Sequence, residues 1–447
     1  MGTRILVLSR HVVGKRMASP GIRSYQIARV LAEKVPGASV TLAVPSCTDL
    51  PSEELLFRVV AYNRRSLPQV VRQQDVVIAN RFPFYIIPFL HDKRLVLDLF
   101  TPVFTEWMEI AIGFWRGLSL NNFVALNRRN LSLQLTLADL VLFATSRQRD
   151  LYFGMLSGMG RVTPELYDHD SSLSNLLALA PFGVRPGHPK ATRQVLRGVW
   201  PGIREEDTIL LWNGTIIEWY DLESLVRAVH RLSRERDDIK LFFLGTEHPD
   251  SGDVATLHGL GAGSTRRAIS MCEELGILDK FVFFNFDWVD YDDTANYLLE
   301  ADIGVCTYFD NLETRYAFRS RVLDLLWAEL PIICTQGDVL AELVASRPLG
   351  IAIAERDEDA LVDAIRRLAD DKAFVKECKR NLKQAKEEYR WERALEPLVD
   401  YCRRSTDVPR GRAQRALPLA LGLATLSESM FLRALYMRLG RLHLFRR

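Results

Sequence analysis

The feature that most constrains the fold is a regular alternation of short apolar runs with longer amphipathic segments. Residues 5–8 (ILVL) are followed by a helical pattern over 20–34 and then by residues 40–44 (VTLAV). This alternation predicts parallel strands, because a parallel connection needs a long crossover. Further runs of the same kind are predicted as strands: 76–79, 95–98 and 140–144. We therefore expect the first part of the chain to form a doubly wound parallel sheet.

The alternation stops once and then begins again. A polar stretch with prolines and glycines extends to Pro201, and the apolar run 209–212 (ILLW) starts a second series. An amphipathic helix is predicted over 222–235, with Asp221 as its N-cap. Further strands of this series are predicted at these positions: 241–244, 281–284, 303–306 and 331–334. Two α/β domains with a cleft between them are expected, with ligands at the carboxyl ends of the strands.

The predicted boundaries follow these breaks. We expect a first domain at 1–185, a linker at 186–205 and a second domain at 206–385. A helix that returns to the first domain is expected at 386–407, and a basic tail at 408–447. The length of 447 residues agrees with such a division, since single hydrophobic cores stop growing well below it.

Composition excludes several classes of protein. The net charge of +2 gives no argument for binding nucleic acid. The six cysteines lie at least 24 residues apart and the histidines form no HxH or HxxxH pair, so neither a structural metal site nor a disulfide framework is expected. The start of the chain lacks the pattern of a signal peptide, and no stretch approaches the roughly 18–20 apolar residues of a membrane span. These features predict a cytoplasmic protein.

Four stretches, taken in order, resemble one enzyme family. The first is the loop 11–21 with the helix after it. The other three are NGTIIEWYDLESLVRAVHRL at 213–232, KFVFFNFDWVDYDDTANYLLEADIGVCTY at 280–308 and FRSRVLDLLWAELPIICTQGDVLAEL at 318–343. With the closing segment GIAIAERDEDALVDAIRRLADD, they resemble the GT-B glycosyltransferases, in particular the retaining group called family 4. The resemblance covers roughly residues 1–400.

This resemblance implies both a fold and an activity. The fold would be GT-B: two Rossmann-like domains facing a cleft, the first on the acceptor side and the second binding the nucleotide-sugar donor. The enzyme would transfer a sugar to a glycan or lipid-linked acceptor, in bacterial surface polysaccharide synthesis, with retention of configuration. It would need no metal ion and no cofactor.

The chain departs from the family pattern where the donor diphosphate is bound. The arginine and lysine that the family places there fall on Gly214-Thr215 and on Tyr220-Asp221. Neither position carries a cation. Negative charge develops on the leaving diphosphate, so it must be met by other groups. Arg315, Arg319 and Arg321 are the nearest arginines, and an arginine fork can hold two phosphate oxygens. We expect them to replace the missing pair, with Arg319 also catalytic; the alternative is a solvated charged face.

Asp324 takes the place of the family's second glutamate in the alignment on Pro331. The resemblance implies that it binds the two ribose hydroxyls of the donor. An acid in an apolar helix looks buried, and a buried carboxylate without partners is costly. The alternatives are a salt bridge to Arg321 or Arg319, or a rotation that leaves Asp324 exposed.

Loops of the second domain supply further candidates. Glu313 is a catalytic candidate that would contact the donor sugar or balance the arginines, unless it is a solvated loop acid. Gly214 and Thr215 follow a predicted strand, where glycine lets backbone N–H groups approach a phosphate; a tight turn is the alternative. Gly337 lies in a turn after the last strand and would approach the donor through its backbone, unless it serves a plain αβ turn.

The first domain offers candidates on the acceptor side. Ser19, Pro20 and Gly21 read as an N-cap and helix start, with Gly21 at the acceptor site. Arg23 falls in the first helical turn, where a cation opposes the helix dipole. This misfit suggests a task outside the helix, in binding phosphate or acceptor; a surface arginine is the alternative. In the alignment with the family, the first-domain histidine falls on Asp98 or on Thr101. Asp98 would then be a catalytic residue that contacts the acceptor; the alternative is that it is the N-cap of the next helix.

The last segment, 408–447, holds eight arginines and one acid. A helical projection gathers its leucines on one face and arginines on the other, which predicts a basic amphipathic helix. Such a helix would bind an anionic membrane surface, or pack back on the first domain.

Two other readings of the whole chain stay open: a non-catalytic partner subunit with this fold, and a sugar-nucleotide epimerase.

Overall fold

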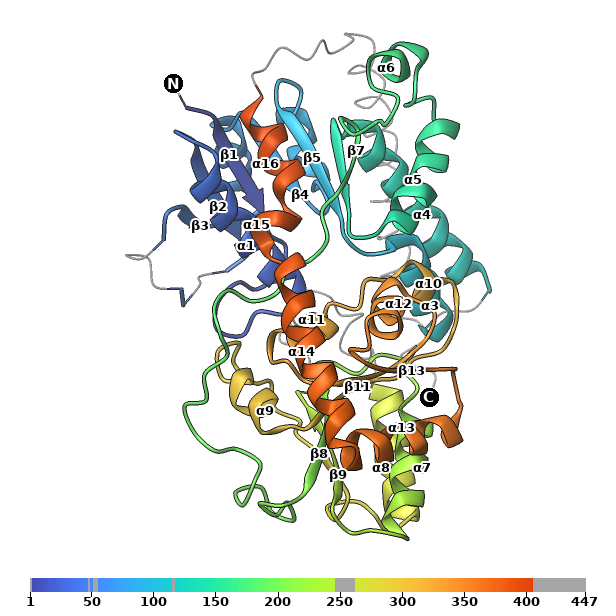
Figure 1. Ribbon diagram of the computed structural model, residues 1–447. Coiled ribbons are helices and arrows are strands. Elements are labelled where there is room, and N and C mark those ends of the chain that lie inside the picture. Colours follow the sequence, from blue (N-terminus) through green and yellow to red (C-terminus); the bar gives the residue numbers. More distant parts are fainter. Residues whose placement is uncertain (1, 47–48, 51–54, 115–116, 246–261, 405–447) are drawn as a thin grey trace.

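The computed structural model describes residues 2–46, 49–50, 55–114, 117–245 and 262–404. It contains two α/β domains (Figure 1). They are joined by a chain crossing, residues 180–207 between β7 of the first domain and β8 of the second, and by a long helix that runs back. The predicted tail 408–447 lies outside the described residues. Within them, no helix combines the length and the apolar character needed to span a bilayer.

The first domain is built on a parallel sheet with the strand order β3-β2-β1-β4-β5-β6-β7. Its strands are β1 (Arg4–Leu8), β2 (Ser39–Val44), β3 (Arg58–Ala61), β4 (Val76–Ala79), β5 (Arg94–Leu99), β6 (Leu140–Phe143) and β7 (Leu177–Leu179). The helical segments are α1 (Ser19–Lys34), α2 (Leu67–Arg72), η2 (Phe84–Phe89), α3 (Val103–Phe114), α4 (Gly117–Leu137), α5 (Ser146–Gly158) and α6 (Pro164–His169). The order reverses direction at β1 and β4, which is the usual place of a ligand-binding crevice.

The second domain repeats the plan with the order β10-β9-β8-β11-β12-β13. Its strands are β8 (Thr208–Asn213), β9 (Ile239–Leu244), β10 (Val282–Phe284), β11 (Ile303–Cys306), β12 (Ile332–Thr335) and β13 (Gly350–Ile353). Its helices are α7 (Leu222–Ser233), α8 (Ala262–Glu274), α9 (Thr294–Glu300), α10 (Leu312–Tyr316), α11 (Arg321–Trp327), α12 (Val339–Ser346) and α13 (Glu358–Asp370). The predicted fold of two doubly wound parallel-sheet domains is confirmed.

Three helices complete the chain: α14 (Lys372–Glu388), α15 (Trp391–Ala394) and α16 (Glu396–Arg403). Helix α14 packs on α11 and α13 of the second domain, whereas α15 and α16 pack on α1, and α16 also on β7, of the first. In Figure 1 these red-orange helices run alongside both domains. The C-terminal segment therefore ties the two domains together.

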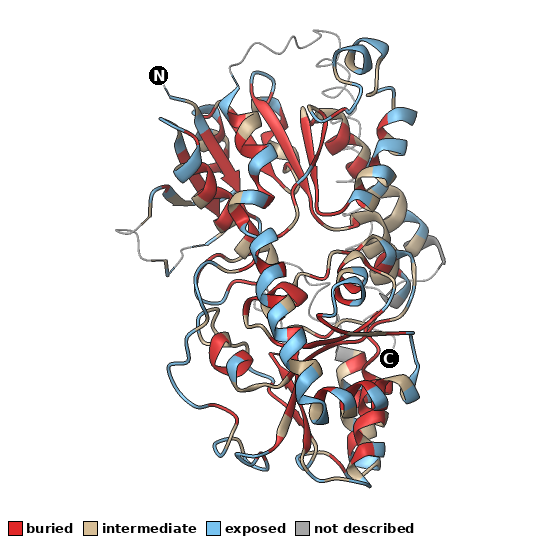
Figure 2. Ribbon diagram, in the orientation of Figure 1, coloured by how far each residue is buried: buried red, intermediate tan, exposed pale blue. Residues whose placement is uncertain are grey.

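Both faces of each sheet are covered, as Figure 2 shows by the red strands inside each domain. Strand β1 illustrates the cause: Ile5 and Val7 belong to one hydrophobic cluster, and Leu6 and Leu8 to another. Because side chains alternate across a strand, a run without polar residues must be buried on both sides. This is why continuous apolar runs located these strands correctly.

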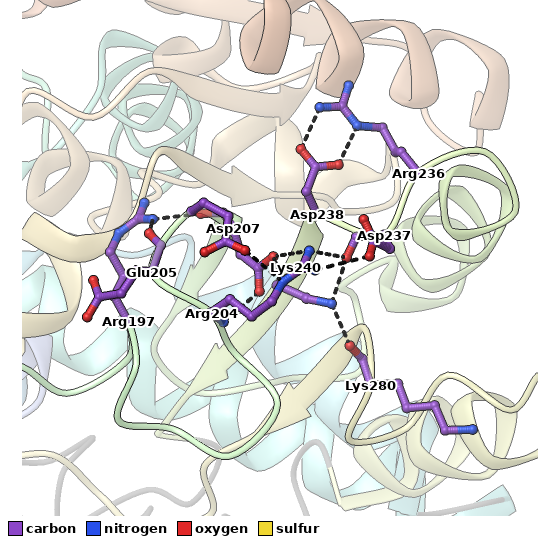
Figure 3. Close-up of polar contacts among 10 residues, drawn as sticks. Arg197, Arg204, Glu205, Asp207, Arg236, Asp237, Asp238, Lys240 and Lys280 are labelled. Atoms are coloured by element: carbon purple, nitrogen blue, oxygen red, sulfur yellow. Dashed lines mark hydrogen bonds and ion pairs between the residues drawn. The ribbon is translucent and has the colours of Figure 1, made fainter.

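A dense ionic cluster closes the amino-terminal edge of the second sheet (Figure 3). Arg204 donates to Asp207 Oδ1 from Nη2 at 2.8 Å, and the ammonium of Lys240 donates to the carbonyls of Asp237 and Lys280. Arg236 forms a bidentate pair with Asp238, which lowers the pKa of that carboxyl. Nη1 of Arg204 also donates to Asp237 Oδ2 at 3.1 Å, so the cluster holds the chain crossing to the sheet at the end opposite the strands' carboxyl ends.

Candidate active site in the interdomain cleft

The candidate site is a cavity of about 310 Å³ between the carboxyl ends of the two sheets. The first domain lines it with the start of α1 and with the segment between β5 and α3. The second domain lines it with the loops after β8 and β9 and with the start of α11. Six of the residues predicted for donor binding or catalysis border it: Gly214, Thr215, Glu313, Arg319, Arg321 and Asp324. Ser19 Oγ and Ser320 Oγ, 3.0 Å apart, join the two walls.

Asp324 faces this cleft and is not the buried acid that the sequence suggested. Its side chain keeps 29% of its surface exposed. Oδ1 accepts a hydrogen bond from Arg185 Nε at 3.0 Å, and Oδ2 accepts one from Asn213 Nδ2 at 3.3 Å. An ion pair was one of the alternatives, but the predicted partners Arg319 and Arg321 are wrong. The carboxylate is thus fixed in place and still has lone pairs open to the cleft.

Arg185 borders the cavity, although no signal in the sequence singled it out. It belongs to the chain crossing, next to Val184, which bridges to Arg390. Its guanidinium lies 3.8 Å from the Tyr291 ring centroid and 5.0 Å from that of Trp327. Such stacking holds an arginine at little cost in hydrogen bonds. An arginine in a polar stretch carries no local pattern that would have shown this.

Arg321 lies beside the glycine loop, as predicted for a donor contact. Nη2 donates to the Thr215 carbonyl and to the Tyr220 hydroxyl, both at 2.8 Å. Its guanidinium also lies over the rings of Trp212 and Tyr220. Nη1 is buried and has no hydrogen-bond partner among the described residues. The residue borders the cleft, where the charge of its guanidinium suits an anionic ligand.

Arg319 and Glu313, both predicted to be catalytic, are each other's partners. Nη1 and Nη2 of Arg319 donate to the two carboxylate oxygens of Glu313, at 3.1 and 2.5 Å. Burial opposes the charge of Arg319, but the Glu313 carboxylate raises its pKa well above the ordinary value. Nη2 also donates to Thr314 Oγ1 at 3.0 Å. The pair borders the cleft as one nearly neutral unit, and its catalytic role stays a prediction.

The glycine loop has the geometry that a close ligand needs. Gly214 has a φ of +100°, and a Cβ built there would meet no atom within 4 Å. The positive φ explains why glycine is present, and the open space lies on the cleft side. The carbonyl of Thr215 is held by Arg321, so the loop is fixed from behind.

Arg315 and Gly337 lie outside the residues that border the cleft. Arg315 is exposed, and its carbonyl accepts from Arg147 Nη1 at 3.2 Å. The Gly337 carbonyl accepts from the same atom at 2.6 Å, and Arg147 also pairs with Glu342. The backbone at Arg315 and at Gly337 therefore contacts the first domain through Arg147. Donor binding by these two residues stays a prediction that no contact supports.

The acceptor-side candidates Arg23 and Asp98 form one buried ion pair. Arg23 donates from Nε and Nη2 to the two oxygens of Asp98, both at 2.7 Å. Its remaining donors bind the carbonyls of Ala180 and Pro181, and its guanidinium lies over Phe182. Neither side chain borders the cleft. The task outside the helix that we inferred for Arg23 is this pair, while contact with acceptor stays a prediction for both residues.

The start of α1 differs in detail from the prediction. Ala18, and not Ser19, is the N-cap, without a side-chain hydrogen bond. Gly21 is buried, and a Cβ there would lie 2.1 Å from the Val12 carbonyl oxygen. The close approach of the loop 11–17 therefore requires a glycine at position 21. Contact between Gly21 and the acceptor stays a prediction. By contrast, Asp221 caps α7 as predicted, by accepting from the Ser224 amide at 3.1 Å.

Glu106 of α3 is a second residue that the sequence did not single out. It borders the cleft from the first domain, and the Thr101 hydroxyl donates a hydrogen bond to its carboxyl. Burial, followed by the charge of Glu313, raises the pKa of Glu106 to about 7. An acid at the start of a helix ordinarily serves the helix dipole, so no sequence signal distinguished it.

A larger cavity, of about 630 Å³, lies on the side of α1 and α14. Its charged groups are mostly paired: Arg29 with Glu392, Lys386 with Glu329, and Arg390 with Glu387. Of the residues discussed so far only Arg185 borders both cavities. No three His, Cys, Asp or Glu side chains in the described part of the chain are grouped to hold a metal ion.

Comparisons with known proteins agree with the fold. Residues 200–388 match the family model of the glycosyl transferases group 1. No curated protein sequence matches the chain. Similar solved structures include a sucrose-phosphate synthase from Thermosynechococcus elongatus, with a TM-score of 0.59 and 17% identity over 89% of this chain and 98% of that one.

Two further structures share the fold. Anabaena HepE, in complex with UDP and glucose, has a TM-score of 0.59 and 11% identity over 89% of this chain and 98% of that one. WaaG, a glycosyltransferase involved in lipopolysaccharide biosynthesis, has a TM-score of 0.57 and 16% identity over the same shares. The similarity in structure shows the GT-B fold, and the family match covers the domain that carries Asp324 and Arg321. The chain is therefore a glycosyltransferase with the GT-B fold, and its residues 200–388 match the glycosyl transferases group 1 model.

Proposed function

We propose that this enzyme takes a sugar from a nucleoside diphosphate donor bound on the second domain and transfers it to a glycan or lipid-linked acceptor. The observation that carries the proposal is Asp324, a carboxylate fixed by Arg185 and Asn213 but still open to the cleft. A ribose offers two adjacent hydroxyl donors that suit such a carboxylate. Asp324 lies within residues 200–388, which match the glycosyl transferases group 1 model, and this match supports the proposal.

The diphosphate would lie between the glycine loop and Arg321. The guanidinium of Arg321 borders the cleft, and Gly214 leaves room for a phosphate at the backbone. Cationic and backbone donors aimed at a leaving diphosphate stabilise its developing charge without a metal ion. We therefore propose metal- and cofactor-independent transfer. HepE, which binds UDP, makes a uridine nucleotide the first donor to test.

Finer features of the proposal rest on the order of the sequence motifs. They support a divergent member of family 4 that retains the anomeric configuration and acts in bacterial surface polysaccharide synthesis. WaaG, with its role in lipopolysaccharide biosynthesis, is a structural relative in the same area of chemistry. The configuration of the product, read from its anomeric proton coupling in NMR, tests the stereochemistry: inversion would remove the family 4 assignment.

The tail 408–447 supports a location at the cytoplasmic face of the membrane, through arginines that attract anionic headgroups and leucines that insert. Co-sedimentation with phosphatidylglycerol vesicles compares the full chain with a protein that ends at residue 405. Pelleting of the full chain alone supports membrane contact, whereas equal pelleting of both proteins contradicts it.

Donor binding is the direct test of the function. We expect UDP or GDP, or their sugars, to raise the melting temperature, as a ligand that binds only the folded state must. Asp324→Asn should weaken binding by about tenfold, since a hydrogen bond to a charged group is lost. Asp293→Asn removes an exposed acid of the same domain and is the matched control. Unchanged nucleotide affinity in Asp324→Asn would remove the ribose assignment.

A further inference from the structure

The larger cavity, of about 630 Å³, lies between the two domains, where α15 follows α14. Its other walls are the last turns of α1, the chain crossing at residues 184–188 and Trp327 at the end of α11. These elements meet midway between the two sheets (Figure 1). Small-molecule sites often lie at domain interfaces, and their volumes are about 300–1,000 Å³. The cavity is therefore large enough for a ligand the size of a sugar phosphate.

The floor of this cavity is apolar and its edge is cationic. Val184, Trp327 and Trp391 border it, and all three side chains are buried. Lys34 and Arg393 also border it, and both are exposed. A pocket with apolar walls and a few charged groups suits an organic molecule that carries a charge of the opposite sign. Here that charge would be negative.

Cations are in excess among the charged groups that border the cavity. Six arginines and lysines lie there, against three glutamates: Arg29, Lys34, Arg185, Lys386, Arg390 and Arg393, with Glu33, Glu387 and Glu392. All three glutamates are held by Arg29 or Arg390. The side chains of Lys34 and Arg393 form no hydrogen bond or ion pair with a residue that the structure describes. Two cations at the edge are thus left for a ligand.

Arg185 connects this cavity with the candidate active site, because its side chain borders both. Nε donates to Asp324, and Nη1 donates to the Tyr291 carbonyl and to Thr294 Oγ1. Nη2 has no acceptor among the described residues, and it is not one of the buried donors. An accessible guanidinium nitrogen and two exposed cations can together hold the oxygens of a phosphate group.

We propose that this cavity is a second ligand site, which binds a sugar phosphate and thereby strengthens binding of the donor. The phosphate would be bound by Lys34, Arg393 and Nη2 of Arg185. The sugar would lie against the apolar floor formed by Trp327 and Trp391. Binding in the cavity is independent of the function proposed above, whereas the effect on the donor rests on it.

The effect on the donor follows from the two contacts of Arg185. A phosphate at Nη2 leaves the hydrogen bond from Nε to Asp324 in place and restrains the guanidinium that orients this carboxylate. Asp324 is then held in the position that the donor ribose needs, so less ordering is required when the donor binds. Coupling between two sites ordinarily changes affinity about 5–150-fold, and we expect about fivefold because one side chain forms the link. By the same linkage, UDP should strengthen binding of the sugar phosphate by an equal factor.

Glucose 6-phosphate and ribose 5-phosphate test the site, with glucose as the probe that lacks a phosphate. Binding to the full chain is measured by calorimetry. We expect the wild type to bind both sugar phosphates and not glucose. The double variant Lys34→Gln/Arg393→Gln should lose about tenfold or more in affinity, because two charge-assisted hydrogen bonds are removed. Both side chains are exposed and unpaired, so its melting temperature should stay within about 2 °C of the wild type.

Lys379→Gln/Lys383→Gln is the matched control. It also removes two exposed cations, from the same helix α14 that borders the cavity, but neither residue lines the cavity. It should bind the sugar phosphates like the wild type. Calorimetry with UDP, with and without saturating glucose 6-phosphate, measures the coupling. The expected fivefold gain in UDP affinity should be lost in Lys34→Gln/Arg393→Gln and in Arg185→Ala.

Three results would contradict the proposal. One is a wild type that binds neither sugar phosphate, and another is equal binding by the wild type and the double variant Lys34→Gln/Arg393→Gln. The third is a UDP affinity that glucose 6-phosphate does not change. If no nucleotide binds, but binding of glucose 6-phosphate still depends on Lys34 and Arg393, the site is upheld and the proposed function is refuted. The two failures are therefore distinguishable.

Discussion

Arg185 Nε donates to Asp324 Oδ1 at 3.0 Å, so a residue of the chain crossing holds the acid of the donor motif. Nη1 of the same guanidinium donates to the Tyr291 carbonyl at 2.6 Å and to Thr294 Oγ1 at 2.7 Å. One side chain thereby links the crossing, the start of α9 and the start of α11. The orientation of Asp324 depends on a contact that spans 139 residues of sequence.

Replacing Arg185 by alanine should destabilise the protein and weaken donor binding together. Three charge-assisted hydrogen bonds are lost from a mostly buried group, which costs about 2–3 kcal/mol of unfolding free energy. Asp324 also loses the partner that fixes its rotamer, so UDP affinity should fall about tenfold. Urea unfolding and calorimetry with UDP measure the two effects.

Arg193→Ala is the control for that substitution. Arg193 lies on the same crossing, and its ion pair with Asp293 is exposed on both sides. Such pairs contribute about 0–1 kcal/mol, so stability and affinity should change little. If Arg185→Ala behaved like Arg193→Ala, the ion pair with Asp324 would have no part in holding the site.

Two arginines of the donor motif, Arg321 and Arg315, should differ in their effect on nucleotide affinity. Arg321→Ala removes a guanidinium that borders the cleft beside the glycine loop and should raise the dissociation constant for UDP about 10–100-fold, the range for a charge-assisted hydrogen bond. Arg315→Ala removes an exposed side chain that does not border the cleft and should leave affinity unchanged. Equal losses of affinity in the two variants would support the prediction from the sequence that the three arginines of the motif act as one cluster.

The sequence predicted the fold better than the site, for a physical reason. Buried parallel strands are continuous apolar runs, so runs such as residues 5–8 and 303–306 located β1 and β11 directly. The strands that were missed, β3 (RVVA), β7 (LAL) and β13 (GIAI), are short or carry a charged or small residue. Local pattern is weakest in such segments.

Side-chain pairing could not be predicted in the same way. Arg23 and Asp98 were both selected from their local surroundings, yet nothing in the sequence indicated that they bind each other across 75 residues. The same holds for Arg185 with Asp324. An ion pair depends on where two elements meet in three dimensions, whereas a motif specifies only one element. The position of the glycine loop directly after β8 was predicted because its signal, a glycine after a strand, is local.

Gly214→Ala should affect ligand binding more than stability. Gly214 has a φ of +100° and free space at its Cβ, so the folded state loses only about 1–2 kcal/mol from backbone strain. The added methyl group would occupy the position where we place a phosphate, so UDP affinity should fall about tenfold or more.

Gly276→Ala provides the matched control for the glycine loop. Gly276 also has a positive φ, of +68°, and open space around its Cβ, but it lies after α8, outside the cleft. A similar loss of stability with unchanged UDP affinity is expected for this variant. If both substitutions lowered affinity equally, strain spread through the domain would explain the effect, and the phosphate position would be wrong.

The buried pair of Arg23 and Asp98 should be far more important for stability than for donor binding. Arg23→Met alone leaves a buried carboxylate uncompensated, and Asp98→Leu alone leaves a buried guanidinium; each should cost about 3–5 kcal/mol of unfolding free energy.

The double variant removes both charges and should be less destabilised than the sum, because apolar residues of similar size often replace a buried pair at little cost. Urea unfolding of the four proteins gives the coupling free energy, expected at about 3 kcal/mol or more in favour of the pair, since each single variant costs about 3–5 kcal/mol. The double variant should bind UDP like the wild type, because neither side chain borders the cleft. Additive losses of stability would show that the two residues act independently, and would return Asp98 to the list of candidate contacts for the acceptor.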